Sequence, residues 1–519
     1  MTTPALPWLP DQGDGTFANP IIHADYSDPD AIRAGDDFYM TASSFGHIPG
    51  LPILHSKDLI NWRLINHAIK RMPLPGYDRP QHGNGVWAPS LRYHAGKFWI
   101  FYGDPDVGIF MTTADTPEGE WSELHLVQAG KGLIDACPFW DDDGQAYLVH
   151  AYAQSRSGIK HRLIVHRMSP DGKRLLDDSR IIIDDPVRHP TIEGPKMYKR
   201  GGYYYIFAPA GGVENGWQTV LRSVHPFGPY EYRIVLKQGA TDVNGPHQGA
   251  WIELASGESW FMHFQHKDAY GRIVHLQPMS WTEEQWPQMG EDIDGDGIGE
   301  PVSRVRKPAV DGDCRAEGPA SSDSFDEQRL GLQWQWQANP EAGWYSLAAR
   351  QGYLRLYAQP LPVGAVSCYQ APHLLLQKFP ALAFEASVQM DGSGLRDGDR
   401  SGLIVFGYRY AALVCAIDAQ GPELRFVEGS QDGECTTWTR KLERLPEALA
   451  LRVVVEEGAL CSFLYSLDGQ TYEAVGGAAF EATVSKWVGA KVGLFAQSAG
   501  AASGSADFDN FTVAAVAKP

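Results

Sequence analysis

Three carboxylic acids recur at equivalent positions of short motifs along this chain. They are Asp28 in "SDPDAI", Asp135 in "IDACPF" and Glu193 in "IEGPKM". Two carboxyl groups are enough to cleave a glycosidic bond, because one protonates the leaving oxygen and the other activates water or attacks directly. A third carboxylate nearby raises the pKa of the acid by repulsion between like charges and keeps it protonated near neutral pH. Each motif alone is typical of a turn, but their recurrence in one frame favours a shared site.

The motifs belong to a unit that recurs five times at a spacing of roughly fifty residues. Each unit holds a polar motif, a short strand, a tight polar turn such as "HAGK" or "KRGG", and a strand rich in aromatic residues. This pattern predicts an all-β fold whose residues 1–305 form a five-bladed β-propeller. The inner strands of a propeller line one channel, so equivalent residues of the five units should converge there: Asp28, Trp87, Asp135, Glu193 and His247.

The pattern changes after the propeller. Residues 306–321 are rich in Pro, Gly and Ala and are expected to form a linker. Residues 322–519 contain alternating strands such as "GYLRLYA" and "LALRVVVEEG", which predict a β-sandwich of the jelly-roll type. We find no catalytic constellation in this second domain. We expect it to brace the propeller, or to close the pocket with one loop so that only chain ends enter.

Composition excludes several classes of partner. The net charge of −19, without a local basic patch, argues against nucleic acid and anionic membranes. The 16 Trp, 22 Tyr and 21 Phe suit β-rich packing and also stacking against sugar rings. The six cysteines form no CxxC pair, no apolar run reaches transmembrane length, and the first residues lack signal-peptide features. We therefore expect a cytoplasmic protein that acts on a small-molecule or oligosaccharide substrate.

The blade motifs resemble those of a known family. The segments "NPIIHADYSDPDAI", "GVWAPSLRYHAGKFWIFYG", "GLIDACPFWDDDGQAYLVH", "TIEGPKMYKRGGYYYIFAPAGG" and "NGPHQGAWIEL" look like successive blades of glycoside hydrolase family 43. The resemblance extends over about residues 19–310, and the end of the chain is similar to the sandwich found beside many such propellers. It implies hydrolysis of β-xylosides or α-L-arabinofuranosides with inversion. Asp28 would then be the general base, Glu193 the general acid, and Asp135 the residue that orients the acid and tunes its pKa.

The resemblance also assigns the pocket walls. Trp87 would pack against the sugar, Phe45 would form another wall, and Arg272 would border the sugar-binding subsite. His247 matches a channel histidine that in many members helps to hold a calcium ion or its waters. A hydrogen-bonded core histidine is an equally good interpretation of His247. The hydrolysis itself needs no cofactor, so a calcium ion in the channel is the one cofactor that we expect.

Three features depart from the expected patterns. Cys137 stands where many members have Pro or Ser, and His47 stands where relatives often have an aromatic residue, so the pocket wall is expected to differ. The acidic loop "EDIDGDGIGEPV" at 291–302 looks like an EF-hand start. Counted from Asp292, however, its twelfth position is Ser303 instead of the Glu that binds calcium bidentately. We interpret it as an acidic exit loop of the last blade.

Two alternatives remain at this point. A retaining β-fructosidase on a similar propeller would carry "NDPNG" and "RDP" motifs, whereas this chain has "SDPDA" and "IDACP". A carbohydrate-binding propeller without catalysis would tolerate the loss of any one carboxylate, yet all three are present. Both alternatives are therefore weaker than an inverting exo-glycosidase.

Overall fold

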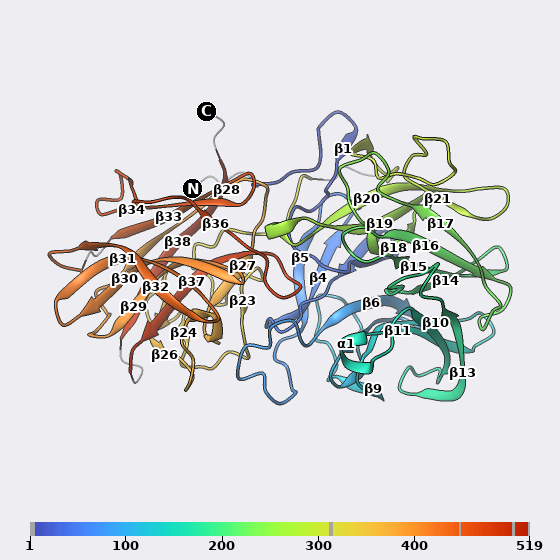
Figure 1. Cartoon of the computed structure of the whole chain (residues 1–519), viewed down its shortest axis with the longest axis horizontal. Helices are drawn as coiled ribbons and strands as arrows, with labels where there is room; N and C mark the ends of the chain where they lie inside the picture. Colours follow the sequence, from blue (N-terminus) through green and yellow to red (C-terminus); the bar gives the residue numbers. More distant parts are fainter. Residues whose placement is uncertain (1–5, 311–314, 446–447, 501–503, 517–519) are drawn as a thin grey trace.

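The computed structural model describes residues 6–310, 315–445, 448–500 and 504–516. It consists almost entirely of β-strands arranged in two domains that lie side by side (Figure 1). The blue-to-green part is a propeller, and the yellow-to-red part is a sandwich. The predicted all-β fold with a propeller and a β-sandwich is thus confirmed.

The propeller has five blades, each an antiparallel sheet of four strands in chain order. The blades are β2–β5 (Asp30–Ala34, Asp37–Thr41, Gly50–Ser56, Arg63–Ile69), β6–β9 (Trp87–His94, Lys97–Asp104, Gly108–Ala114, His125–Ala129), β10–β13 (Leu133–Trp140, Ala146–Tyr152, Arg162–Met168, Leu175–Asp184), β14–β17 (Lys196–Arg200, Tyr203–Ala210, Trp217–Ser223, Glu231–Leu236) and β18–β21 (His247–Glu253, Ser259–His266, Arg272–Trp281, Pro287–Met289). The short helices α1 (Gln154–Ser157) and η1 (Asp268–Tyr270) lie in connections.

The predicted polar turns join the first two strands of each blade. In the second blade His94 pairs with Lys97 across Ala95 and Gly96, whose φ angles are +50° and +78°. Two consecutive left-handed residues define a type I′ turn, whose twist matches that of the flanking strands. Gly201 and Gly202 make the same turn in the fourth blade. The turn residues therefore set the register of these hairpins.

Apolar side chains fill the space between neighbouring blades and close the ring. The cluster between the last and first blades contains Trp62 and Trp260, which are almost fully buried. Phe17 of β1 (Thr16–Ala18) joins this cluster, and β1 pairs with β22 (Arg304–Arg306) after the last blade. Both ends of the propeller are therefore tied to the same seam, which holds the ring closed.

The sandwich comprises two sheets that enclose one large core. One sheet contains β23 (Gln335–Trp336), β26 (Gln359–Pro360), β27 (Leu375–Lys378), β29 (Asp399–Phe406), β30 (Arg409–Asp418), β31 (Gly421–Ser430), β32 (Gly433–Lys441) and β37 (Lys491–Ser498). The other contains β24 (Tyr345–Ser346), β25 (Leu354–Tyr357), β28 (Phe384–Asp391), β33 (Leu449–Glu456), β34 (Leu460–Ser466), β35 (Glu473–Ala474), β36 (Phe480–Glu481) and β38 (Ser505–Ala515). The helical turn η2 (Cys368–Gln370) follows β26. Of the predicted linker 306–321, residues 311–314 lie outside the described residues.

The two domains are joined by backbone hydrogen bonds as well as by apolar contacts. Ile48 and Trp336 exchange both of their backbone hydrogen bonds across the interface. The Asn339 side chain bonds both the N–H and the carbonyl of Met72. Such paired bonds fix the orientation of the sandwich, and therefore of its loops, relative to the propeller.

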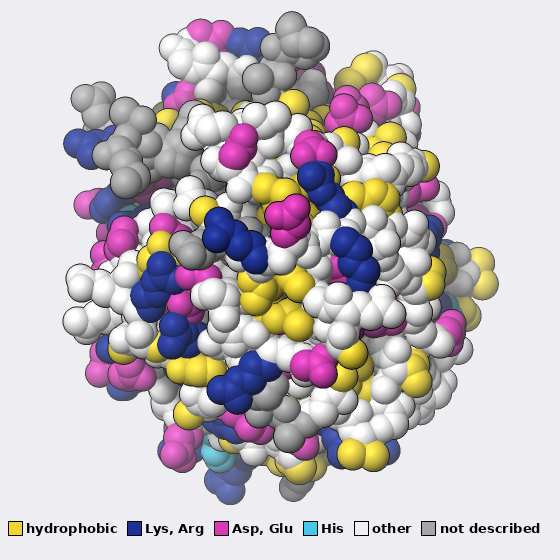
Figure 2. Space-filling view, turned by 90° about the vertical axis from the view of Figure 1, so that its left-hand side faces the viewer, with side chains coloured by type: hydrophobic (Ala, Val, Ile, Leu, Met, Phe, Trp, Pro, Cys, Tyr) yellow, Lys and Arg dark blue, Asp and Glu magenta, His cyan; other side chains and the backbone are white. Residues whose placement is uncertain are grey.

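The outer end of the sandwich carries charges of both signs, interspersed with small apolar patches (Figure 2). No broad basic field covers this face, in agreement with the acidic composition. Among the described residues, no helix is long and apolar enough to cross a membrane.

Candidate active site

The three carboxylic acids line one pocket of about 220 Å³ in the propeller. Asp28 precedes β2, Asp135 lies within β10, and Glu193 precedes β14. Three different blades thus contribute one carboxyl group each. The remaining lining residues include the three predicted wall residues and seven others: Phe45, Trp87, Arg272, Ala88, Ile134, Thr191, Gly212, Val213, Gln248 and Trp487.

The backbone turns the two aspartates towards the pocket. Asp28 and Asp135 have φ angles of +55° and +59°, in the left-handed region that few residues other than glycine adopt. In β10 the pairing register shifts between Ile134 and Cys137, so Asp135 occupies a β-bulge. A bulge redirects a side chain at the cost of local strain, of about 1–3 kcal/mol for each such residue. This strain is typical of a functional position.

Hydrogen-bond donors surround the Asp28 carboxylate. Ser27 and Ser43 donate their hydroxyls to Oδ2 at 2.7 and 2.6 Å. Arg272 Nη1 lies 3.1 and 3.2 Å from the two carboxylate oxygens. An ionised carboxylate only accepts hydrogen bonds, so this environment suits the charged form that a general base needs.

Asp135 is held in the opposite electrostatic environment. Burial and then the neighbouring Glu193 carboxyl raise the pKa of Asp135 well above its ordinary value of 3.8. A hydrogen bond from the Gly194 N–H to Oδ2, at 2.7 Å, opposes this rise in pKa but does not cancel it. Burial and a like charge both disfavour ionisation, so Asp135 retains its proton more readily than an isolated aspartate would.

Replacing Asp135 with Asn is expected to change how stability depends on pH. A folded-state pKa above the unfolded value means that Asp135 favours folding at low pH, and that this contribution is lost as pH rises above about 4. Asn does not titrate. The Tm difference, Asp135→Asn minus wild type, should therefore increase from pH 4 to pH 7 in thermal melts. The exposed Asp142→Asn serves as the control, and a difference that does not vary with pH would contradict the prediction.

Glu193 contacts the predicted channel histidine directly. His247 Nε2 lies 2.9 Å from Glu193 Oε1, and the His247 ring is fully buried. Its Nδ1 is buried without a hydrogen-bond partner among the described residues. Calcium prefers six to eight oxygen ligands. Within the described residues no group of three or more acidic, His or Cys side chains gathers around His247 in metal-binding geometry. The donor set does not fit direct calcium coordination, and calcium at His247 stays a prediction.

Aromatic rings form the walls of the pocket. The Trp87 indole N–H donates to the Gly83 carbonyl at 2.9 Å, which fixes the ring. Phe45 and Trp487 contact this ring edge-on, with centroids 6.3 and 6.0 Å away. Trp487 belongs to the sandwich and lies in the loop before β37. The expected closing loop of the second domain therefore reaches the pocket.

Several lining residues were not identified from the sequence. Trp487 stands in "VSKWVGA", which has no motif relation to the blades. Gln248 directly follows the predicted His247, has φ +36° and presents a buried amide oxygen without a partner among the described residues. In the sequence, only its position next to His247 in "GPHQG" pointed to Gln248. Thr191 is the first residue of the quoted fourth segment but was not singled out there, and Val213 directly follows that segment.

The departures noted in the sequence lie outside the pocket wall. His47 is buried against the sandwich, where burial and then the charges of Lys491 and Lys378 hold its pKa well below 6.5. Cys137 is fully buried within β10. Neither residue lines the pocket, so the expected change of wall at these positions is not observed.

The acidic loop after the last blade forms ion pairs with a lysine of the neighbouring blade. Asp292, Asp294 and Asp296 group together, and the ammonium of Lys237 forms ion pairs with Asp294 and Asp296. The loop follows β21, the last strand of the last blade, as expected of an exit loop, and the missing EF-hand ligand stays an interpretation of the sequence.

The propeller and its three converging carboxyl groups define a glycoside hydrolase. Family comparison agrees: the model described as "Glycosyl hydrolases family 43" matches residues 17–287, and "Beta xylosidase C-terminal Concanavalin A-like domain" matches residues 322–514. The chain belongs to glycosyl hydrolase family 43, an inverting family. This membership decides against the β-fructosidase and non-catalytic alternatives.

Relatives are similar over both domains. A putative beta-xylosidase of Xylanibacter ruminicola is 40% identical over 93% of this chain and 86% of its own length. A non-reducing end alpha-L-arabinofuranosidase of Bacteroides ovatus is 30% identical over 75% of this chain and 73% of its own. The crystal structure of a xylan beta-1,4-xylosidase from Bacillus halodurans shares the fold, with a TM-score of 0.85 and 24% identity, over 96% of this chain and 99% of that one.

Proposed function

We propose that this protein is an inverting exo-glycosidase that releases xylose, L-arabinofuranose or both from xylo-oligosaccharides or arabinoxylan fragments. The observation that carries the proposal is the convergence of Asp28, Asp135 and Glu193 on one small pocket. The relatives named for β-xylosidase and α-L-arabinofuranosidase activities support this choice of sugars.

The roles of the three acids follow from their surroundings. Asp28, surrounded by donors, takes a proton from water as that water attacks the anomeric carbon. Glu193 donates its proton to the glycosidic oxygen as the bond from carbon to oxygen breaks. Asp135 lies beside Glu193 in the same pocket, where it orients the acid. Inversion follows when the base and the acid act on opposite faces of the sugar, and the two carboxyl groups need no cofactor for it.

The pocket size supports release of single sugars. Its volume of about 220 Å³ lies below the roughly 300–1,000 Å³ typical of sites for drug-sized ligands. Trp87 offers an apolar ring face of the kind that stacks on sugars. Trp487 closes the pocket from the sandwich side. A site of this size and shape fits one terminal pentose.

Hydrolysis of a chromogenic β-D-xyloside and an α-L-arabinofuranoside, measured in parallel, tests the proposal and identifies the preferred sugar. NMR of the first-formed product should show the anomer opposite to that of the substrate. No turnover of either substrate by the folded protein would contradict the proposal, and a retained anomer would contradict inversion.

Trp487→Ala is expected to weaken binding of the terminal sugar. Aromatic contacts of this kind contribute about 0.5–1.5 kcal/mol, so KM should rise by up to about tenfold while kcat changes less. Opening the wall should also allow products longer than one sugar from xylohexaose. Tyr408→Ala, an exposed aromatic position on the sandwich outside the pocket, is the matched control. Unchanged KM and products would show that Trp487 has no part in exo action.

A further inference from the structure

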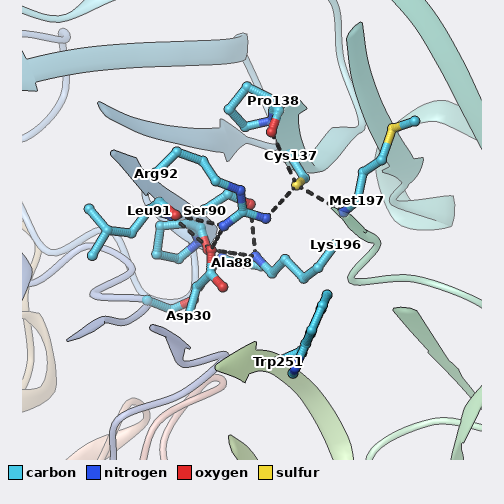
Figure 3. Close-up of polar contacts among 12 residues, drawn as sticks. Asp30, Ala88, Ser90, Leu91, Arg92, Cys137, Pro138, Lys196, Met197 and Trp251 are labelled. Atoms are coloured by element: carbon cyan, nitrogen blue, oxygen red, sulfur yellow. Dashed lines mark hydrogen bonds and ion pairs between the residues drawn. The ribbon is translucent and has the colours of Figure 1, made fainter. Parts of the chain in front are cut away.

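Charged and polar side chains of the inner strands form a layer of contacts around Arg92 (Figure 3). Asp30 comes two residues after Asp28, and Cys137 two residues after Asp135. Lys196 comes three residues after Glu193. Asp30, Cys137 and Lys196 are at most 1% exposed. Together with Arg92 of the second blade they bring one side chain from each of four blades to the same place.

The Arg92 guanidinium is the hub of this layer. Its Nη1 donates to Asp30 Oδ2 at 2.8 Å, and its Nη2 donates to Cys137 Sγ at 2.9 Å. A single planar group thereby joins the first and third blades. Figure 3 shows the guanidinium between these two partners. The fork of a guanidinium can hold two acceptors in fixed directions, which the point charge of a lysine cannot do.

The fourth blade is joined to the same layer. The Met197 N–H donates to Cys137 Sγ at 3.3 Å. The ammonium of Lys196 donates to Pro89 O and Ser90 Oγ, each at 2.8 Å, and lies 3.7 Å from Asp30. The strands that follow the three catalytic carboxyl groups are therefore tied to one another through Arg92 and Cys137.

The position of this layer matches a need of the active site. Asp28 and Asp135 both hold left-handed backbone conformations, which persist only where the surroundings impose them. The regular pairing of β10 resumes at Cys137, immediately after the bulge that aims Asp135. The hydrogen bonds from Arg92 to Asp30 and to Cys137 hold the chain at the point where each strained segment ends.

We propose that Arg92 is a positioning residue that, through Asp30 and Cys137, holds the base Asp28 and the neighbouring Asp135 in their catalytic orientations. The inference rests on the proposed function for the roles of these aspartates. Displacement of a reacting group by about 1 Å can cost a factor of 10² in rate. Loss of this tie should therefore lower kcat more than it changes substrate binding.

Arg92→Lys tests the proposal, because it keeps the charge and removes the two-pronged donor. We expect kcat to fall about tenfold to a hundredfold, with KM within about threefold of wild type. Arg162→Lys is the control, since Arg162 also uses two donors, both to Asp184 Oδ2, but at the propeller surface. Folding is checked by circular dichroism and Tm. An unchanged kcat in folded Arg92→Lys would overturn the proposal.

Cys137 provides a second and milder test. Cys137→Ala removes the acceptor of Arg92 Nη2 and should lower kcat, whereas Cys137→Ser restores an acceptor and should recover part of it. Equal kcat in both variants and the wild type would overturn the role of this contact. A crystal structure of Arg92→Lys gives a readout without turnover: Asp135 should leave its left-handed conformation, and an unchanged Asp135 would refute the proposal even if the proposed activity failed.

Discussion

Glu193→Gln is expected to lower kcat on xylo-oligosaccharides by about 10²–10⁴-fold, the usual contribution of a general acid. Gln has nearly the same shape and can still contact His247, so the fold and KM should change little. The loss should depend on the leaving group. A nitrophenolate leaves without a proton, so a nitrophenyl glycoside should lose much less activity than xylobiose.

This dependence separates an acid from a merely structural residue. We would measure kcat for both substrates with Glu193→Gln and with Glu253→Gln, an exposed glutamate of the last blade. Equal losses on xylobiose and on the nitrophenyl glycoside would argue that Glu193 is not the proton donor. Full activity on both would remove it from the mechanism.

Asp28→Asn is expected to lower kcat by a similar factor of about 10²–10⁴, on good and poor leaving groups alike. The base acts on the attacking water, so a leaving group that departs more easily does not compensate for the loss of the base. Asn keeps an oxygen that can accept from Arg272 and Ser43, which limits damage to this buried cluster. Asn244→Asp, which alters a polar side chain outside the lining residues, checks that a charge change elsewhere in the propeller has no comparable effect.

Chemical rescue gives the sharper measurement for Asp28. Azide is already an anion and needs no base, so it should restore turnover of the nitrophenyl glycoside by Asp28→Ala and form a glycosyl azide of inverted configuration. The same azide should not restore hydrolysis of xylobiose by Glu193→Gln, because the leaving group still lacks a proton. If azide fails with folded Asp28→Ala, Asp28 does more than activate water.

The acidic segment at residues 25–30 shows how tertiary structure divides neighbouring residues of one type. Asp28 faces the pocket, and Asp30 bonds Arg92 in the buried layer. Asp25 accepts from the Arg272 N–H at 2.9 Å and from the Gly489 N–H at 3.0 Å, so it links the pocket arginine to the sandwich loop that carries Trp487. Nothing in the spacing of these three acids distinguishes their partners.

The amino-acid sequence by itself determined the propeller and the second β-domain. Strand alternation, aromatic content and turn residues such as Ala95–Gly96 are local properties, and local hydrogen bonding decides them. Repetition of one unit then predicted that Asp28, Asp135 and Glu193 occupy equivalent positions in three repeats. Closure of the ring of blades brings these equivalent positions to a common pocket.

Only the tertiary structure decided what surrounds these acids. Trp487 reaches the pocket because paired backbone bonds dock the sandwich on the propeller, and no periodicity links its position to the blades. Gln248 and Arg92 acquire their places through bulges and ion pairs that join strands far apart in the chain. Contacts of this kind depend on the relative position of whole sheets in space, which a linear pattern does not encode.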